Sequence, residues 1–348
     1  MKFNTKNAFF TYTLLITAGI LFSSHTLYLK MDGYFLEPGQ ETRLSLYNGS
    51  FDNSENSIAR DRMLDASLVA QGERTAIASN QWEDQDSTIT YLSFKAGAPG
   101  TYVAGVATKP RNIALTAEKF NDYLQHDGVV DMLAYRTKNG LLDQDALESY
   151  EKHVKAIYQV GDTKTDDWKT VLGYPIEFVP QENPYEKYKG DTLAIQLLLE
   201  GAPLSNQLVY IDYSSKDKTH THGTGKAHTH GNETHTHDGQ DDHTHASAQE
   251  LRTNEQGIIE MNLPIEGIYY LRTIHMVPVT NEGELTHRSK WATLSFEVTH
   301  QHGDSTHTHD HHHSHDQEEG FPTWGFVLIS VLIIALLFLL FRKKSTDA

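Results

Sequence analysis

Residues 173–213 have the sequence GYPIEFVPQENPYEKYKGDTLAIQLLLEGAPLSNQLVYIDY, and this stretch decides the fold class. It contains three extended, apolar-rich segments at 175–180, 191–199 and 207–213. Gly201-Ala202-Pro203 separates the last two segments and is typical of a turn. Short extended segments joined by Gly- and Pro-containing turns predict β-strands of an antiparallel sandwich.

The same strand pattern resumes further along the chain, after a polar interruption. The resumed segments are Gln249–Thr253, Gly257–Leu263, Gly267–Val277 and Lys290–Val298. We therefore expect residues 173–299 to form one β-sandwich with a histidine-rich loop inserted at 216–246. A long surface insertion between two strands adds little loop-closure entropy, so the sandwich should fold around it.

Upstream, residues 25–172 predict a first β-sandwich that carries a helical insertion at about 113–160. The expected strands are Thr26–Phe35, Glu41–Tyr47, Thr88–Phe94 and Thr101–Thr108. Apolar spacings of three and four predict helices at 116–127, 130–138 and 143–158. The fold class expected is mainly β, with two antiparallel sandwiches of immunoglobulin-like or transthyretin-like type.

The two ends predict export and membrane anchoring. Residues 1–24 combine Lys2 and Lys6 with a short apolar run, which is typical of a secretory signal peptide. An uncleaved membrane anchor is the alternative for this run. Residues 321–341 are almost wholly apolar and long enough to cross the bilayer as a helix.

The basic residues that follow this helix set the expected topology. Arg342, Lys343 and Lys344 begin the tail 342–348, which the positive-inside rule assigns to the cytoplasm. We expect a single-pass protein of the cell membrane, with the bulk of the chain periplasmic or otherwise extracytoplasmic.

Charge and cysteine content limit the classes of partner. The formal net charge of −17 argues against nucleic acid, which requires a basic surface. The absence of cysteine excludes disulfides, thiolate metal sites and cysteine nucleophiles. Metal binding therefore has to use His, Asp, Glu or a free amine.

Sixteen of the 21 histidines lie in two short polar segments. The first histidine tract, within 216–246, contains His220, His222, His228, His230, His235, His237, His243 and His245. The second histidine tract, in a juxtamembrane linker at 300–319, contains His300, His302, His307, His309, His311, His312, His313 and His315. Neutral imidazole suits Zn, Cu and Ni, so we expect several weak, interchangeable metal sites. A hydrophilic spacer with incidental metal affinity is the alternative.

His25 and His275 are the two further candidate ligands. Cleavage after Ser24 would leave His25 amino-terminal, where its amine and ring chelate copper or nickel together; cleavage after Phe22 would leave Ser23-Ser24-His25, a square-planar site. A histidine at the start of a strand is the alternative. His275 is either a ligand that joins His25 or a half-buried strand histidine.

Three other polar residues are not expected to bind metal. His126 and His153 fall on predicted helices and are expected to be solvated or to cap helices. Glu177, which alternates outward from an apolar pair, is expected to be structural.

Several short segments in the exported portion suggest a family. They are His25–Leu29, Phe120–Leu124, Asp127-Gly128, Tyr150–Lys155, Gly173–Pro180, Asn183–Tyr185, His275-Met276 and Trp291. Their order resembles a bacterial family of exported domains of unknown function, labelled as periplasmic or membrane components of nickel or cobalt uptake. The resemblance implies metal handling at the envelope. Thr26 stands where members usually have an acidic residue, so a role that needs a carboxylate there is not implied.

Enzymatic motifs are absent from the sequence. It contains no zinc-protease His-Glu-X-X-His, no Gly-X-Ser-X-Gly and no phosphate loop, so we expect no enzyme. The function expected is an envelope-anchored protein that binds Ni, Co, Zn or Cu and assists uptake or delivery, with a metal transporter as a partner. The alternative is a surface interaction or stalk protein whose histidine-rich segments respond to metal or pH.

Overall fold

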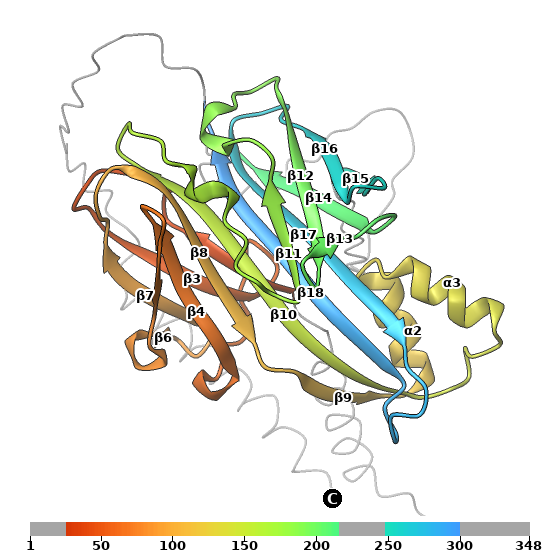
Figure 1. The fold of residues 1–348 in the computed structure, drawn as a ribbon. Coiled ribbons are helices and arrows are strands. Elements are labelled where there is room, and N and C mark those ends of the chain that lie inside the picture. Colours follow the sequence, from red (N-terminus) through yellow and green to blue (C-terminus); the bar gives the residue numbers. More distant parts are fainter. Residues whose placement is uncertain (1–25, 216–247, 300–348) are drawn as a thin grey trace, which may run out of the picture. The chain divides into compact units, whose positions relative to one another are not determined.

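The computed structural model describes residues 26–215 and 248–299 (Figure 1). The strands are β1 Thr26–Met31, β2 Phe35–Leu36, β3 Glu41–Gly49, β4 Met63–Ala70, β5 Glu73–Ala76, β6 Glu83–Gln85, β7 Ile89–Lys95, β8 Gly100–Thr108, β9 Arg111–Leu115, β10 Ala146–Val160, β11 Ile176–Pro180, β12 Thr192–Leu199, β13 Ala202–Pro203, β14 Leu208–Ser214, β15 Gln249–Arg252, β16 Ile258–Asn262, β17 Gly267–Pro278 and β18 His287–Val298. The α-helices in these ranges are α2 Ala117–His126 and α3 Val130–Lys138, and four short 3₁₀ turns occupy Arg60–Arg62, Ser79–Gln81, Asp166–Lys169 and Pro184–Glu186. The prediction of a mainly β protein is confirmed.

One large open sheet contains strands from both halves of the chain. Its order is β15-β14-β17-β18-β10-β8-β4-β5, and the short strands β2 and β9 also pair with β10. At its centre β10 runs parallel to β18, with Lys152 opposite Trp291 and Glu148 opposite His287. Most other pairs are antiparallel. Because β10 precedes residue 173 and β18 follows it, the sheet is continuous across the predicted domain boundary.

Two smaller sheets cover opposite faces of the large one. Strands β1, β3, β7 and β6 form one of them, and β11, β12, β13 and β16 form the other. The side chains of β8 point alternately into two separate cores. Val103 and Ala107 belong to the core beneath β11 and β12. Ala104 and Val106 belong to the core beneath β1 and β3. All nine residues of β8 are buried, as expected for a strand covered on both faces.

The helical insertion is shorter than predicted. The helices α2 and α3 agree with the expected ranges 116–127 and 130–138. The third predicted helix, at 143–158, is wrong, because residues Ala146–Val160 form the strand β10. The apolar spacing of Leu147, Tyr150 and Val154 fits a helical stripe, but pairing with β18 and burial of both faces override this local pattern.

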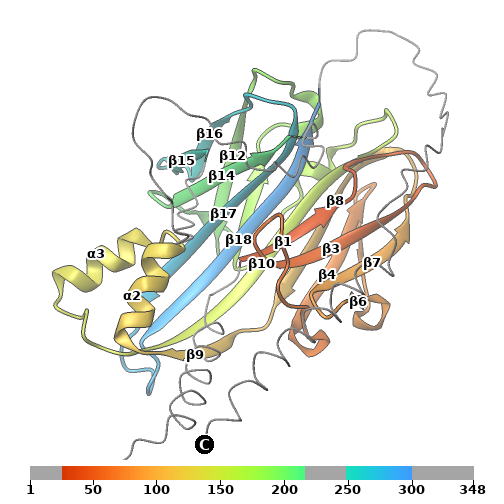
Figure 2. The ribbon, with the colours of Figure 1, turned by 180° about the vertical axis from the view of Figure 1, so that it is seen from behind.

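The helix α2 lies on the same side of the large sheet as β1 (Figure 2). It buries Phe120, Tyr123 and Leu124 in a core cluster with Trp291 and Ile274 of the sheet. Within the described ranges, no helix is long and apolar enough to span a bilayer. The predicted membrane helix at 321–341 and the signal peptide at 1–24 lie outside the described residues.

Gly128 ends the α2 segment, as predicted, and only glycine fits there. Its φ is +74°, and an added Cβ would lie 2.3 Å from the Tyr210 hydroxyl oxygen. The Tyr210 hydroxyl donates to the Gly128 carbonyl at 2.9 Å. The loop after α2 is therefore fixed against β14.

Candidate functional site

Most of the predicted metal ligands cannot be placed. His25 and all sixteen histidines of the two tracts lie outside the described residues. The remaining four histidines, His126, His153, His275 and His287, are described and occupy four separate environments. In residues 26–215 and 248–299, no group of three or more His, Asp or Glu side chains is arranged to hold a metal.

His275 is half-buried on β17 and already has a polar partner. Its Nδ1 lies 3.0 Å from Gln207 Oε1. Burial, and then the nearby charge of Lys290, lower the pKa of its imidazole, so the neutral ring is favoured. Tyr270 of the same strand contacts Tyr28 of β1, with ring centroids 5.6 Å apart. Because residues an odd number apart on a strand point to opposite faces, His275 faces away from β1.

His153 differs from its prediction. It lies on β10 with its side chain fully buried, and its Nε2 is 3.8 Å from Glu151 Oε1. The expectation of a solvated or capping histidine on a helix is therefore wrong for this residue. His126 does end α2 and is partly exposed, with Nδ1 2.8 Å from Asp127 Oδ1; this hydrogen bond raises the pKa of its imidazole. His287, which the sequence did not single out, is buried, and burial with the charge of Arg136 lowers its pKa to about 4.

The structural role predicted for Glu177 is confirmed, although its side chain is buried rather than directed outward. Its carboxylate accepts the backbone N–H groups of Leu172 at 2.9 Å and Gly173 at 2.8 Å. It also accepts a hydrogen bond from Lys155 Nζ at 3.1 Å. Glu177 therefore fixes the segment before β11 to the large sheet.

A set of buried ionisable groups lies where the start of β1, the end of α2 and the first half of β10 meet. We call it the β1 cluster, and define it as Tyr28, Tyr123, Asp127, Glu148 and Lys152. All five residues are less than a tenth exposed. Clusters of perturbed ionisable groups often mark functional sites, so this set is the candidate site among the described residues.

Glu148 forms the part of the β1 cluster nearest α2. Its carboxylate accepts hydrogen bonds from the Tyr123 hydroxyl at 3.2 Å and from the Ser289 hydroxyl. Trp291 Nε1 donates to the same Ser289 oxygen at 3.0 Å. Burial raises the pKa of Glu148 to about 7 despite these donors, so the carboxyl group changes charge near neutral pH.

Lys152 carries the opposite charge four residues further along the same face of β10. Its ammonium donates to Asn48 Oδ1 at 3.4 Å and lies 5.1 Å from the centroid of the Trp291 ring. Burial, and then the charge of Arg62, lower the pKa of Lys152 to about 7. The cluster thus contains an acid and a base that both titrate near neutrality.

Asp127 is the member whose hydrogen bonding is incomplete. Its Oδ1 pairs with His126 Nδ1, and its backbone carbonyl accepts from Arg272 Nη1 at 2.8 Å. Its buried Oδ2 has no hydrogen-bond partner within the described part of the chain. Buried carboxylate oxygens are almost always hydrogen-bonded, so Oδ2 is available to a further group.

The first residues of β1 lie at this cluster. Leu27 pairs with Asn48, the residue that accepts from Lys152. The Tyr28 hydroxyl hydrogen-bonds the Thr26 side chain and lies within the field of Asp127, and burial raises the pKa of this phenol to about 12. His25 directly precedes Thr26 in the sequence.

Sequence reasoning missed the β1 cluster. Lys152 and Glu148 were assigned to a helix, and their shared face appears only once β10 is known to be a strand. The available signal was the set of segments that suggested the family, because they contain Tyr28, Tyr123, Asp127 and Lys152.

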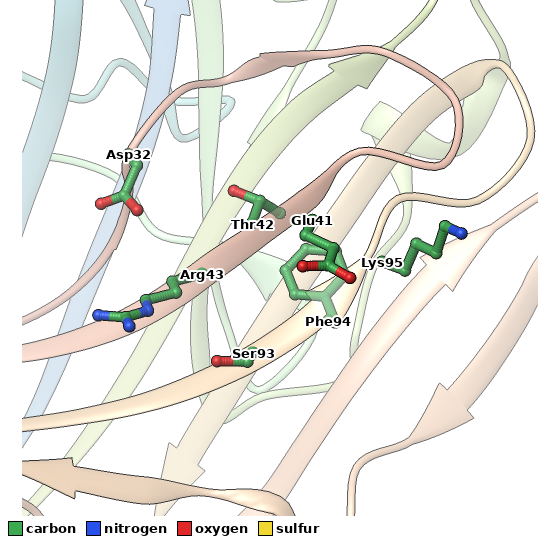
Figure 3. Close-up of a pocket in the computed structure, with 7 residues that line it drawn as sticks. All are labelled: Asp32, Glu41, Thr42, Arg43, Ser93, Phe94 and Lys95. Atoms are coloured by element: carbon green, nitrogen blue, oxygen red, sulfur yellow. The ribbon is translucent and has the colours of Figure 1, made fainter.

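A surface hollow on β3 and β7 does not form a convergent site. It is lined by Asp32, Glu41, Thr42, Arg43, Ser93, Phe94 and Lys95 (Figure 3). The Arg43 guanidinium lies 4.8 Å from the Tyr91 ring centroid, and Figure 3 shows Arg43 and Lys95 pointing away from one another. These cations therefore do not act on one common point.

Comparisons with solved structures give low similarity. A DUF4785 family protein from Legionella pneumophila is 6% identical with a TM-score of 0.21, and the match covers 53% of this chain and 38% of that one. A Salmonella alpha-2-macroglobulin is 10% identical with a TM-score of 0.18, covering 78% and 15%. The adhesin InvE of Yersinia pseudotuberculosis is 10% identical with a TM-score of 0.17, covering 79% and 58%. This chain thus spans less than two thirds of each of these proteins.

No curated protein matches the chain. A family match is extensive, because residues 22–277 fit the family described as "Domain of unknown function (DUF4198)". This range includes the β1 cluster, the helices and most strands of the large sheet. The chain therefore belongs to the DUF4198 family.

Proposed function

We propose that this protein is an envelope-anchored metal-binding protein that collects Ni, Co, Zn or Cu through its two histidine tracts and assists uptake or delivery. The observation that carries the proposal is the distribution of histidine. Sixteen of the 21 histidines lie in the tracts. The four described histidines lie beside separate neighbours, namely Asp127, Glu151, Gln207 and Thr286. Imidazole is therefore concentrated in the two tracts.

The spacing of the tract histidines suits reversible capture. Four His-Thr-His triplets recur in the first tract, and in an extended chain the two rings of a triplet project to the same side. A polar segment of low complexity loses conformational entropy when a ligand orders it, so each site is weak. Many weak sites in one segment load and release ions readily.

The finer parts of the proposal come from the sequence. They comprise removal of residues 1–24, a membrane helix at 321–341, a transporter partner and two sandwiches of immunoglobulin-like or transthyretin-like type. The resemblance to proteins linked with nickel or cobalt uptake favours those two metals. Together they describe a capture module beside a transporter.

Growth of a deletion strain tests the biological role. Loss of the gene should impair growth when Ni, Co or Zn is scarce, and the intact gene should restore it. A gene with all sixteen tract histidines replaced by asparagine should fail to restore growth, although the polar length is unchanged. A growth defect of the same size at low and high metal concentrations would contradict the proposal and favour a surface interaction or stalk protein.

A further inference from the structure

We infer that the folded exported portion docks on the surface of its own membrane through a basic patch, which we define as Arg62, Leu64, Lys109 and Arg111. In this arrangement the three cationic side chains bind the phosphate groups of anionic lipids, and the Leu64 side chain enters the headgroup layer. The inference rests on the membrane anchor of the proposed function, but it involves neither the histidine tracts nor a metal ion.

Backbone and side-chain contacts bring the cationic residues of the basic patch together. The Lys109 backbone N–H donates to the Arg62 carbonyl at 2.8 Å, and Arg62 Nη2 donates to the Lys109 carbonyl at 3.4 Å. Arg62 Nη1 also donates to the Tyr150 hydroxyl oxygen at 3.2 Å. Arg111 lies directly opposite Tyr150 in the antiparallel pair of β9 and β10, so both side chains lie on one face of the sheet. The patch therefore lies beside Tyr150, where β8 passes into β9 (Figure 1).

The cations of the basic patch have no acidic partner in the described part of the chain. Two of them are exposed and Arg62 is half-buried, and none forms an ion pair within residues 26–215 and 248–299. By contrast, the neighbouring Arg60 is paired with Asp84 at 2.9 Å. Asp61 is an exposed carboxylate beside the patch, so the net charge of these segments remains positive. On a chain of net charge −17, this positive surface is suited to an anionic partner.

A β-bulge turns the side chain of Leu64 outward. Met63 pairs with Thr108 and Asp65 with Ala107, so Leu64 is an extra residue without a partner in β8. Met63 packs against the core beneath β1 and β3, whereas Leu64 is 60% exposed. Among the described residues it is the most exposed large apolar side chain. The bulge therefore adds an exposed apolar group to the cations of the patch.

This combination suits a membrane surface with anionic lipids. Surfaces that bind the interface combine cations, which bind lipid phosphates, with apolar side chains that enter the headgroup layer. An acidic protein would also neutralise the cations, but a bilayer accommodates a protruding leucine without a matching pocket. The segment between β18 and the predicted membrane helix at 321–341 has a maximum span of roughly 75 Å, which exceeds the roughly 40 Å length of β18. An anchored chain therefore keeps the basic patch within reach of the bilayer.

The test uses the absence of cysteine from the chain. Leu64→Cys provides a single site for an environment-sensitive nitrobenzoxadiazole dye on the full chain, reconstituted in vesicles. With phosphatidylglycerol present, the dye should emit at shorter wavelength and be quenched by spin-labelled lipids. In vesicles of phosphatidylcholine alone, its emission should remain that of a dye in water. High salt should reverse the shift, because it screens the attraction.

Substitutions of the cations test the charge contribution separately. In the labelled chain, Arg62→Gln, Lys109→Gln and Arg111→Gln should each lower the ratio of docked to undocked chain about fivefold. Lys95→Gln removes an exposed cation of β7 outside the patch and should leave this ratio unchanged. Near-UV circular dichroism should show that each variant is folded.

A second labelling site controls for adsorption of the dye. Val171 is 51% exposed and lies outside the patch, so a dye on Val171→Cys should give the same emission in both kinds of vesicle. An equal shift at the two labelling sites would overturn the inference. Emission from the Leu64→Cys dye that is the same in neutral and anionic vesicles would also overturn it, and would leave the patch to an acidic protein. No metal is added, so neither result bears on metal binding by the histidine tracts.

Discussion

Lys155 Nζ and Glu177 Oε2 lie 3.1 Å apart, and both side chains are 1% exposed. Lys155 also donates to the carbonyl oxygens of Thr170 at 3.1 Å and Phe178 at 2.9 Å. Glu177 accepts three backbone N–H groups, those of Leu172, Gly173 and Tyr174, from the segment between Thr170 and Phe178. This buried pair joins the 170–178 segment to β10 and hence connects the sequence on either side of residue 173.

Lys155→Met should destabilise the protein by about 3–5 kcal/mol, because it leaves the Glu177 carboxylate buried without its cation. Thermal unfolding of the purified full chain, followed by near-UV circular dichroism, measures the effect. Lys169→Met is the matched control, since Lys169 and its partner Asp166 are 54% and 79% exposed, and it should cost less than about 1 kcal/mol. Equal losses in the two variants would contradict the structural role of the pair.

Glu148 should make the protein less stable as pH rises from about 4.5 to about 7. Burial raises its pKa from 4.5 to about 7 in the folded protein, so in this window the folded state binds more protons than the unfolded state. The contribution is about 3 kcal/mol, at about 1.4 kcal/mol per pKa unit. Denaturant unfolding at pH 5 and pH 7.5 should show this fall in the native chain, and a much smaller fall in Glu148→Gln. Glu118→Gln, on the exposed surface of α2, should keep the native pH dependence.

Lys152 should have the opposite effect on the pH dependence of stability, and at higher pH: the free energy of unfolding should rise as pH increases. Burial lowers its pKa from 10.5 to about 7, so between these values the unfolded state binds more protons and stability rises with pH. Lys152→Met should flatten the rise in unfolding free energy between pH 7 and pH 9.5. A slope identical to that of the native chain would show that the ammonium is not desolvated in the folded protein.

Strands and helices that are bounded by turn or capping residues were predictable from the sequence. Gly201 lies in the turn after β12, although the predicted turn residues Ala202 and Pro203 form the short strand β13. Thr116 and Gly128 mark the limits of α2. Each depends on a local preference of a few residues, so no knowledge of distant contacts is needed.

The strand β10 and the β1 cluster were not predictable in this way. The parallel partner of Lys152 is Trp291, far along the chain, and no short-range pattern encodes that pairing. Both faces of β10 are covered, so its residues do not alternate between apolar and polar, and Leu147, Tyr150 and Val154 produce a helical spacing by chance. The polar side chains Glu148 and Lys152 are buried through tertiary contacts alone.

Metal retention by the tracts should depend on pH. Only neutral imidazole binds metal, and an unperturbed histidine has a pKa of about 6.5. Equilibrium dialysis against Ni(II) or Zn(II) should therefore show most ions bound at pH 7.5 and most released by about pH 5.5. Binding that is unchanged over this range would indicate carboxylate ligands instead.

The most direct test of the central claim is the metal content of the full chain, purified without an affinity column and equilibrated with Ni(II) or Zn(II). Elemental analysis should find several ions per native chain, clearly fewer after deletion of 216–246, and at most one when all sixteen tract histidines are asparagine. An unchanged number of ions per chain in these variants would contradict the assignment of metal capture to the histidine tracts.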